Sequence, residues 1–211
     1  MRFKNRSEAG RLVAGALDHY RDRPDALILA LPRGGVPVGY EIAKALHLPL
    51  DVFIVRKLGV PGEEELAMGA IASGGVRSLN KSVIDQLGIP QSVIDDVSNR
   101  EALEVERREW LYRGDKSPID VSNRVVILVD DGLATGSTMK AAVAALRRQN
   151  PARIVVAVPT APPEACEELQ PNADEVVCAV TPEPFFSVGL WYEHFDQTTD
   201  AEVTELLRRA A

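Results

Sequence analysis

The chain contains very few cysteines, and they show no pattern typical of a metal site or a disulfide-rich protein. Cys166 and Cys178 are the only two among 211 residues. Two cysteines are too few for a disulfide framework. Neither stands in a CxxC motif or a Cys/His cluster, so a structural zinc site is not predicted. We expect both to be ordinary buried thiols.

Long apolar segments and basic clusters are also absent. The first ten residues, MRFKNRSEAG, lack the apolar stretch of a signal peptide, and no run of about 18 apolar residues follows. Asp and Glu total 31 against 24 Lys and Arg, which gives a net charge of −7. Because non-specific nucleic-acid binding depends on basic clusters, we predict that nucleic acid is not a partner. Because long apolar segments are absent, we predict a cytoplasmic protein that does not bind a membrane.

The composition that remains is that of a globular α/β protein. Apolar residues make up 45% and charged residues 26%, which is ordinary for a globular domain. A length of 211 residues suits one such domain better than two. We therefore expect a single domain over residues 1–211.

Two segments show the strand–turn–helix–strand order of a βαβ unit. The first unit is predicted at Ala26–Leu31, Pro32–Gly35, Val36–His47 and Leu50–Val55. The second is predicted at Arg124–Val129, Asp130–Ser137, Thr138–Gln149 and Ala152–Pro159. Continuous apolar runs such as ALILAL and RVVILV are typical of strands buried on both faces. The pattern therefore predicts the α/β class, with a central parallel sheet flanked by helices.

The rest of the chain is expected to add helices around this sheet. They are predicted from Asn5 to Tyr20, from the Pro162–Pro163 pair onward, and from the Thr199-x-x-Glu202 capping box to Arg209, with a further strand at Asp174–Val180. Between the two units, the glycine-rich segment Gly59–Gly75 is predicted as a loop. Residues 82–123 are predicted as a helical insertion, with a long, charged, exposed helix at Ser92–Arg113. Residues 181–211 are expected to form a small hood and tail.

The strongest functional signal is an acidic turn directly after a buried strand. Asp130 and Asp131 follow the run VVILV, and the small residues Ala134–Thr138 then lead into a helix. Helix N-termini and hydroxyl groups favour a bound phosphate. Carboxylates at a strand's carboxyl end can accept hydrogen bonds from sugar hydroxyls or hold hydrated Mg²⁺. The alternative is that the acids only cap a helix, but two acids beside a buried strand are unfavourable without a partner.

This segment resembles the motif of type I phosphoribosyltransferases that binds 5-phosphoribosyl-1-pyrophosphate (PRPP). A Walker A loop and a Rossmann GxGxxG motif are both ruled out by the residues present. The resemblance implies that Asp130 and Asp131 are catalytic, bind the 2- and 3-hydroxyls of the ribose and serve as Mg²⁺ ligands. It also implies that the 5-phosphate is held by Ala134, Thr135, Gly136, Ser137 and Thr138. Gly132 departs from the family, which more often has an aliphatic residue there.

A second segment agrees with this resemblance. In the same family, the loop equivalent to Leu31–Gly35 holds pyrophosphate, which implies that role for Arg33, Gly34 and Gly35. The run Arg33–Pro37 is similar to the loop of bacterial xanthine phosphoribosyltransferases. Taken alone, Arg-Gly-Gly could be a tight turn with a solvated arginine. The family often has a cis or strained peptide here, which Gly34 would tolerate at low steric cost.

A basic pair marks a third resemblance. The run Val55–Gly62 is similar to the exit of the second strand in adenine and orotate phosphoribosyltransferases, where a basic pair leads into a mobile catalytic loop. This implies that Lys57 is a catalytic residue that contacts pyrophosphate and that Gly59–Gly75 closes over the reaction; an exposed basic pair is the alternative. The acids Glu63, Glu64 and Glu65 are expected to face solvent.

The hood supplies a fourth resemblance, to the tail of adenine phosphoribosyltransferases. It is carried by Pro184-Phe185-Phe186-Ser187. Five of the eleven aromatic residues gather in this region: Phe185, Phe186, Trp191, Tyr192 and Phe195. One or two of them are expected to stack on a flat base, and the others to pack in a small core.

The resemblance implies a Mg²⁺-dependent enzyme that moves ribose-5-phosphate from PRPP to a nitrogen of a base, as a homodimer in nucleotide salvage. In the hypoxanthine/guanine and xanthine enzymes, an Asp usually stands three residues after the second acid, where this chain has Ala134. An adenine-like or unrecognised acceptor is therefore favoured. A PRPP-sensing regulator without transfer activity, and a domain acting on an acceptor other than a base, remain alternatives.

Overall fold

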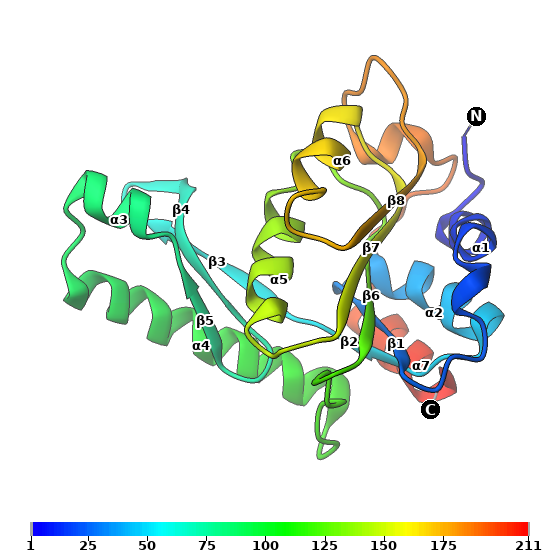
Figure 1. The fold of residues 1–211 in the computed structure, drawn as a ribbon, viewed down its shortest axis with the longest axis horizontal. Coiled ribbons are helices and arrows are strands. Elements are labelled where there is room, and N and C mark those ends of the chain that lie inside the picture. The colour runs from blue at the N-terminus through cyan, green and yellow to red at the C-terminus, as the bar shows by residue number, and fades with distance from the viewer. Residues whose placement is uncertain (1, 211) are drawn as a thin grey trace.

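A parallel sheet forms the centre of the molecule. The computed structural model describes residues 2–210, apart from the side chain of Glu65. Five strands lie in the order β2-β1-β6-β7-β8, and every neighbouring pair is parallel. In chain order they span Ala26–Ala30 (β1), Leu50–Val52 (β2), Val125–Val129 (β6), Arg153–Thr160 (β7) and Glu175–Val180 (β8). The prediction of a parallel α/β sheet is confirmed (Figure 1).

Helices cover both faces of this sheet. The helices α1, α2, α5 and α6 span Arg6–Ala16, Gly35–Leu46, Ser137–Arg147 and Pro163–Leu169. Successive residues of a strand point to opposite faces. Ile28 and Ile127 therefore belong to the core beneath α1 and α2, whereas Leu29 and Leu128 belong to the core beneath α5 and α6. Because all five strands run in one direction, their carboxyl ends share one edge of the sheet.

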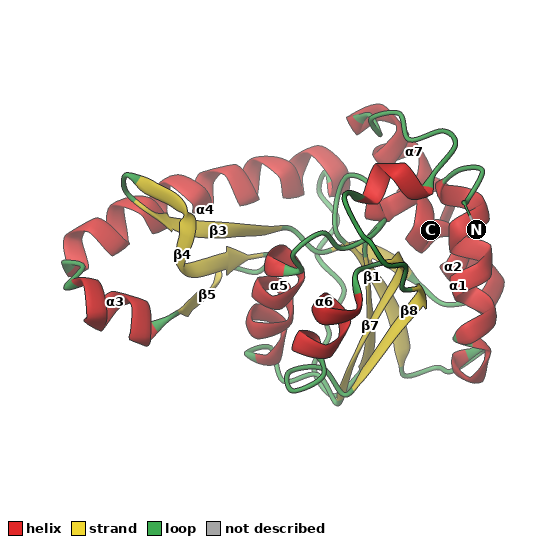
Figure 2. Cartoon of the chain, turned by 90° about the horizontal axis from the view of Figure 1, so that it is seen from above, coloured by secondary structure: helices red, strands yellow, loops and turns green. Residues whose placement is uncertain are grey.

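A second, antiparallel sheet forms an arm that projects from the central sheet (Figures 1 and 2). The arm comprises β3 (Val55–Val60), β4 (Glu63–Ala72), β5 (Val76–Leu79), α3 (Lys81–Leu87) and α4 (Gln91–Arg113). The expected loop at Gly59–Gly75 is therefore wrong. Met68, Ala70, Ile71 and Ala72 are all buried along β4, and this packing outweighs the local preference of the glycines for a loop.

Two other expectations for this region need adjustment. The strand expected at Leu50–Val55 is divided, because β2 ends at Val52 and β3 begins at Val55 in the other sheet. The long charged helix is confirmed as α4, but it buries Ile94, Val97 and Val105 against the arm and core. No helix within residues 2–210 has the length and apolar character required to cross a bilayer.

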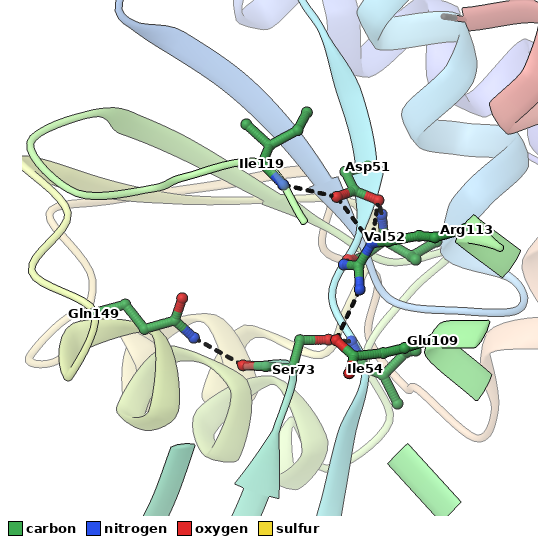
Figure 3. A network of polar contacts seen from close by, with 8 residues as sticks. All are labelled: Asp51, Val52, Ile54, Ser73, Glu109, Arg113, Ile119 and Gln149. Carbon is green, nitrogen blue, oxygen red and sulfur yellow. Dashed lines mark hydrogen bonds and ion pairs between the residues drawn. The ribbon is translucent and has the colours of Figure 1, made fainter. Parts of the chain in front are cut away.

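A buried polar network joins the arm to the central sheet (Figure 3). Arg113, at the end of α4, donates through Nε to both carboxylate oxygens of Asp51 at 2.9 and 3.0 Å. It also donates to Val52 O at 2.5 Å and to Glu109 Oε1 at 2.7 Å. The Asp51 and Arg113 side chains are only 9% and 7% exposed. Breaking such a buried pair typically costs about 3–5 kcal/mol, so the network fixes the root of the arm.

The N-terminal segment joins the hood. Its short helix η2 (Val188–Trp191) precedes the last helix, α7 (Asp200–Ala210). Phe3 donates its N–H to Trp191 O at 2.8 Å, and Phe3 and Tyr192 form an isolated parallel β-bridge. The N-terminal segment is therefore bonded directly to the hood.

The cysteine prediction is wrong, because Cys166 of α6 and Cys178 of β8 form a disulfide. Each looked like an ordinary buried thiol in the sequence, and only the packing of α6 against β8 brings the two together. The disulfide ties a helix on one face of the sheet to the edge strand β8, which leads into the hood.

Replacing both cysteines with serine is expected to lower the free energy of unfolding by about 3 kcal/mol, because a crosslink across a short loop restricts the unfolded chain. The two cysteines are 12 residues apart in the sequence. Urea unfolding with and without a reductant measures the effect. The natural chain should lose stability on reduction, whereas the double variant should not respond. The expectation would be contradicted if the natural chain had the same unfolding midpoint with and without the reductant.

Candidate active site

The acidic turn and the Arg-Gly-Gly loop lie side by side because β1 and β6 are neighbouring parallel strands. Ala30 of β1 pairs with Val129 of β6, so both strands end at the same edge of the sheet. Immediately beyond this pair, Leu31 donates its N–H to Val129 O at 2.8 Å. The fold thus brings together two segments that lie far apart in the sequence.

The approach of the Arg-Gly-Gly loop to the acidic turn is so close that it requires glycine. A Cβ atom on Gly34 would lie 2.0 Å from Asp131 Oδ2. A Cβ atom on Gly35 would lie 2.7 Å from Val129 O and 2.9 Å from Asp130 Cα. The peptide bond between Pro32 and Arg33 is cis, which confirms the expectation of an unusual peptide in this loop.

The acid pair, Asp130 and Asp131, is largely withdrawn from water. Asp131 donates its N–H to Asp130 Oδ1 at 2.8 Å, and Asp131 Oδ2 accepts from Arg6 Nε at 2.8 Å. Burial raises the pKa of Asp130 well above its ordinary value, and the charge of Asp131 raises it further. Burial also raises the pKa of Asp131, against the opposing effect of Arg6. A bound cation or hydroxyl donors would compensate the charge of these carboxylates.

Arg6, the first residue of α1, is a site residue that no sequence signal identified. Besides its bond to Asp131, it donates through Nη1 to Asp196 O at 2.7 Å. Its guanidinium carbon lies 4.0 Å from the centroid of the Phe195 ring. A single arginine in a polar helix start has no distinguishing pattern, and 125 residues separate it from Asp131. Only the tertiary structure reveals the contact.

Two aromatic residues of the hood support the acid pair by packing. Tyr192 donates its hydroxyl to Asp131 O at 2.6 Å and is 1% exposed. Burial raises the pKa of this hydroxyl above its ordinary value. The Phe195 ring stacks on Tyr192 with centroids 4.9 Å apart. These two residues therefore fix the backbone and surroundings of Asp131.

The other aromatic residues of the hood have different environments. Phe185 stacks on Trp191 with centroids 6.4 Å apart, and Phe186 is 79% exposed. Trp191 Nε1 is buried without a hydrogen-bond partner among the residues described. Contact between one or two of these rings and a flat base stays a prediction.

The predicted phosphate loop is open to solvent. Ala134, Thr135, Ser137 and Thr138 are exposed, and the loop ends at the N-terminus of α5. Gly136 has a φ of 69° at the helix cap, a conformation that glycine adopts readily. Thr135 donates its hydroxyl to Ser137 Oγ at 3.2 Å. Ser137 donates its N–H to Thr135 Oγ1 at 3.4 Å. The N-terminus of α5 and these hydroxyl groups together favour an anion.

The Arg33 side chain extends toward α7. Its Nη1 lies 3.8 Å from Asp200 Oδ1, and the same oxygen accepts from the Tyr112 hydroxyl at 2.6 Å. Burial, followed by the hydrogen bond to Asp200, raises the pKa of Tyr112 to about 12. The Arg33 side chain is 35% exposed, so its guanidinium remains accessible to an anion.

Lys57 lies on β3, in a hollow of about 340 Å³ between the β3–β4 hairpin and α4. Arg56, Arg100 and Glu101 line the same hollow, which contains no residue of the acid pair, the Arg-Gly-Gly loop or the phosphate loop. A role for Lys57 beside pyrophosphate stays a prediction. Glu63 and Glu64 are exposed, as expected, whereas the Glu65 side chain lies outside the part of the chain that the structure describes.

The acid pair could serve Mg²⁺ only together with other ligands. Within the described part of the chain, no group of three or more His, Cys, Asp or Glu residues could hold a metal ion. Mg²⁺ is usually held by one or two carboxylates, several waters and substrate phosphates. Two adjacent carboxyl groups whose burial disfavours their charge fit that partial role.

A family comparison covers much of this site. Residues 61–193 match the phosphoribosyl transferase domain. The match includes Asp130, Asp131 and Ala134–Thr138. It begins after the Arg-Gly-Gly loop and Lys57.

One curated relative is similar over nearly the whole chain, and a second over little more than half of it. A Mycobacterium tuberculosis protein, provisionally named a phosphoribosyl transferase, is 43% identical over 208 residues, which are 99% of this chain and 47% of that protein. The chain therefore spans about half the length of this curated relative. The bifunctional protein PyrR of Roseiflexus is 34% identical over 124 residues, which are 57% of this chain and 62% of PyrR.

A solved structure shares the complete fold. The crystal structure of TT1426 from Thermus thermophilus superposes with a TM-score of 0.91, at 40% identity, over 100% of both chains. The arm and hood are therefore included in the likeness.

Proposed function

Because the chain belongs to the phosphoribosyl transferase family, we propose that it transfers ribose-5-phosphate from PRPP to a nitrogen of a nucleobase and releases pyrophosphate. One observation carries this proposal: the Arg-Gly-Gly loop lies against the acid pair at the sheet edge where the phosphate loop also begins. Groups that accept hydrogen bonds from sugar hydroxyls and groups that donate hydrogen bonds to a phosphate thus gather at one edge of the sheet. A sugar phosphate requires both.

Each element has a proposed role in this reaction. The acid pair accepts hydrogen bonds from the 2- and 3-hydroxyls of the ribose, and Ala134–Thr138 holds the 5-phosphate with backbone N–H groups and hydroxyls. The Arg33–Gly35 loop and Lys57 bind pyrophosphate. Mg²⁺, held by substrate oxygens and the acid pair, would neutralise part of the pyrophosphate charge.

The protein's task is to bind and orient. Transfer passes through a cationic, oxocarbenium-like sugar, as in glycoside hydrolysis. The chain therefore needs to fix the ribose, stabilise the leaving pyrophosphate and keep water from the cation.

We assign the hood at 181–211 to the acceptor side of the site and the 82–123 insertion to the arm. We further propose that the protein acts as a homodimer in the cytoplasm, in nucleotide salvage.

The acceptor is proposed to be adenine-like. Ala134 stands three residues after Asp131, and its methyl group cannot exchange a proton with a 6-oxopurine. Pyrophosphate release under saturating Mg²⁺–PRPP, with each base at equal concentration, should therefore be fastest with adenine. A carboxylate base typically contributes about 10²–10⁴-fold, so hypoxanthine, guanine and xanthine should be much slower.

The Asp130→Asn, Asp131→Asn variant, purified in the same way, is the control. Pyrophosphate release by this variant would come from a contaminating host enzyme. Faster turnover with a 6-oxopurine would contradict the role given to position 134 and direct attention to Glu65 as a proton carrier. PRPP binding without turnover on any base would instead support a PRPP sensor.

A further inference from the structure

We propose that Arg6 is a positioning residue for PRPP, holding the Asp131 carboxylate in the orientation that receives a ribose hydroxyl. This inference rests on the proposed function, because it assumes that the acid pair binds the ribose. It adds to that function a residue from the far N-terminal end of the chain. It also gives the hood a defined task, since Arg6 is itself fixed by hood residues.

The contacts of Arg6 leave part of the acid pair available to a ligand. Arg6 Nε bonds to Asp131 Oδ2, the oxygen that also lies closest to Gly34. The Asp131 N–H bonds to Asp130 Oδ1. Neither bond uses Asp131 Oδ1 or Asp130 Oδ2. Each carboxyl thus has one oxygen outside these two bonds, although the two side chains also hydrogen-bond to each other. In the proposed complex, two adjacent ribose hydroxyls bind to carboxyl oxygens in place of that side-chain contact.

Arg6 itself is fixed at three points. Its guanidinium bonds to Asp131, donates to Asp196 O and packs on the Phe195 ring, and its side chain is only 12% exposed. Because the guanidinium is planar and rigid, three contacts fix its orientation in a way that a lysine could not reproduce. The Asp131 carboxylate cannot turn without breaking this arrangement.

The positive charge of Arg6 also favours PRPP binding. PRPP carries several negative phosphates, and two carboxylates at the ribose would repel them. The Arg6 guanidinium compensates one carboxylate at 2.8 Å. An ionised acceptor forms a stronger hydrogen bond to a hydroxyl than a neutral one does. Arg6 therefore favours the charged form of Asp131 beside a polyanionic substrate, although burial, which raises the pKa of this carboxyl, opposes it.

A purely structural role is the alternative, in which Arg6 only ties the N-terminal segment to the hood. Arg2 offers a matched control, because it makes such a tie without touching the acid pair. Its Nη2 donates to Tyr192 O at 2.9 Å. Both arginines join the N-terminal segment to the 192–196 region, but only Arg6 reaches Asp131.

The test measures calorimetric affinities of Mg²⁺–PRPP and Mg²⁺–pyrophosphate for the natural chain and for Arg6→Ala, Arg6→Lys and Arg2→Ala. Pyrophosphate lacks the ribose, so a positioning role for Arg6 predicts a selective effect. Arg6→Ala should weaken PRPP about 10- to 100-fold, the range for one hydrogen bond to a charged group. Pyrophosphate affinity should fall much less than PRPP affinity, because this ligand has no ribose and reaches the acid pair only through Mg²⁺. Arg6→Lys should recover part of the PRPP affinity, and Arg2→Ala should alter neither ligand.

Equal weakening of both ligands by Arg6→Ala, or unchanged PRPP affinity, would overturn the positioning role. If Arg6→Ala does not fold, as judged by its melting curve, the PRPP-selective loss in Arg6→Lys decides the question. A natural chain that binds no PRPP would overturn the proposed function itself. A natural chain that binds PRPP no better than Arg6→Ala would overturn only the inference about Arg6.

Discussion

The Asp130→Asn, Asp131→Asn double variant is expected to lose PRPP binding by about 10²–10⁴-fold, taking about 1.5–3 kcal/mol for each hydrogen bond to a charged group. The two carboxyl groups stand at the end of β6, where burial disfavours their charged forms unless a ligand compensates. Asparagine keeps the shape and the bond from the Asp131 N–H but removes the charge. Calorimetric titration with Mg²⁺–PRPP measures the loss.

A matched pair of acids elsewhere provides the control for this experiment. Asp95 and Asp96 are also adjacent, but they lie on α4 of the arm, where Asp95 pairs with Arg77. The Asp95→Asn, Asp96→Asn variant changes the net charge by the same amount and should bind PRPP normally. Equal affinity in all three proteins would show that the acid pair does not bind PRPP.

The second large effect is expected from Gly35→Ala. The new Cβ would lie 2.7 Å from Val129 O and 2.9 Å from Asp130 Cα. These are backbone atoms of a central strand and the acidic turn, so the loop must move away instead. Overpacking of this kind typically costs about 1–3 kcal/mol of stability. Displacing the loop should also abolish detectable pyrophosphate binding, measured by calorimetry beside a urea unfolding curve.

Gly15→Ala is the control for a change from glycine to alanine. Gly15 lies within α1, and a Cβ there would meet nothing within 4 Å. Alanine in a helix interior should raise stability by about 0.5–1 kcal/mol. Its pyrophosphate affinity should match that of the natural chain. Normal pyrophosphate binding by Gly35→Ala would mean that the Arg-Gly-Gly loop holds no pyrophosphate.

Two features of the fold depart from their local sequence patterns for the same physical reason. The glycines in Gly59–Gly75 favoured a loop, yet Met68 and its buried neighbours on β4 pack into a strand. Cys166 and Cys178 gave no local sign of pairing, because a disulfide depends on how α6 meets β8. In both cases long-range packing outweighed local preference.

Features that depend on neighbouring residues can be predicted from the amino-acid sequence alone. Apolar runs such as VVILV defined the central strands, and Asp130 with Asp131 defined the acidic turn. The Thr199–Glu202 capping box predicted the start of the last helix, and Thr199 Oγ1 accepts from Glu202 N at 3.1 Å. Strand burial, helix capping and turn formation are local, so each leaves a short readable pattern.

Which of these segments meet depends on how the whole chain packs. The parallel pairing of β1 with β6 sets Gly34 and Gly35 against the acid pair. The bonding of the N-terminal segment to the hood brings Arg6 onto Asp131, across 125 residues of sequence. A contact between distant residues depends on the packing of whole elements rather than on any local spacing. Arg6 therefore becomes recognisable as part of the site only once α1, β6 and the hood are assembled.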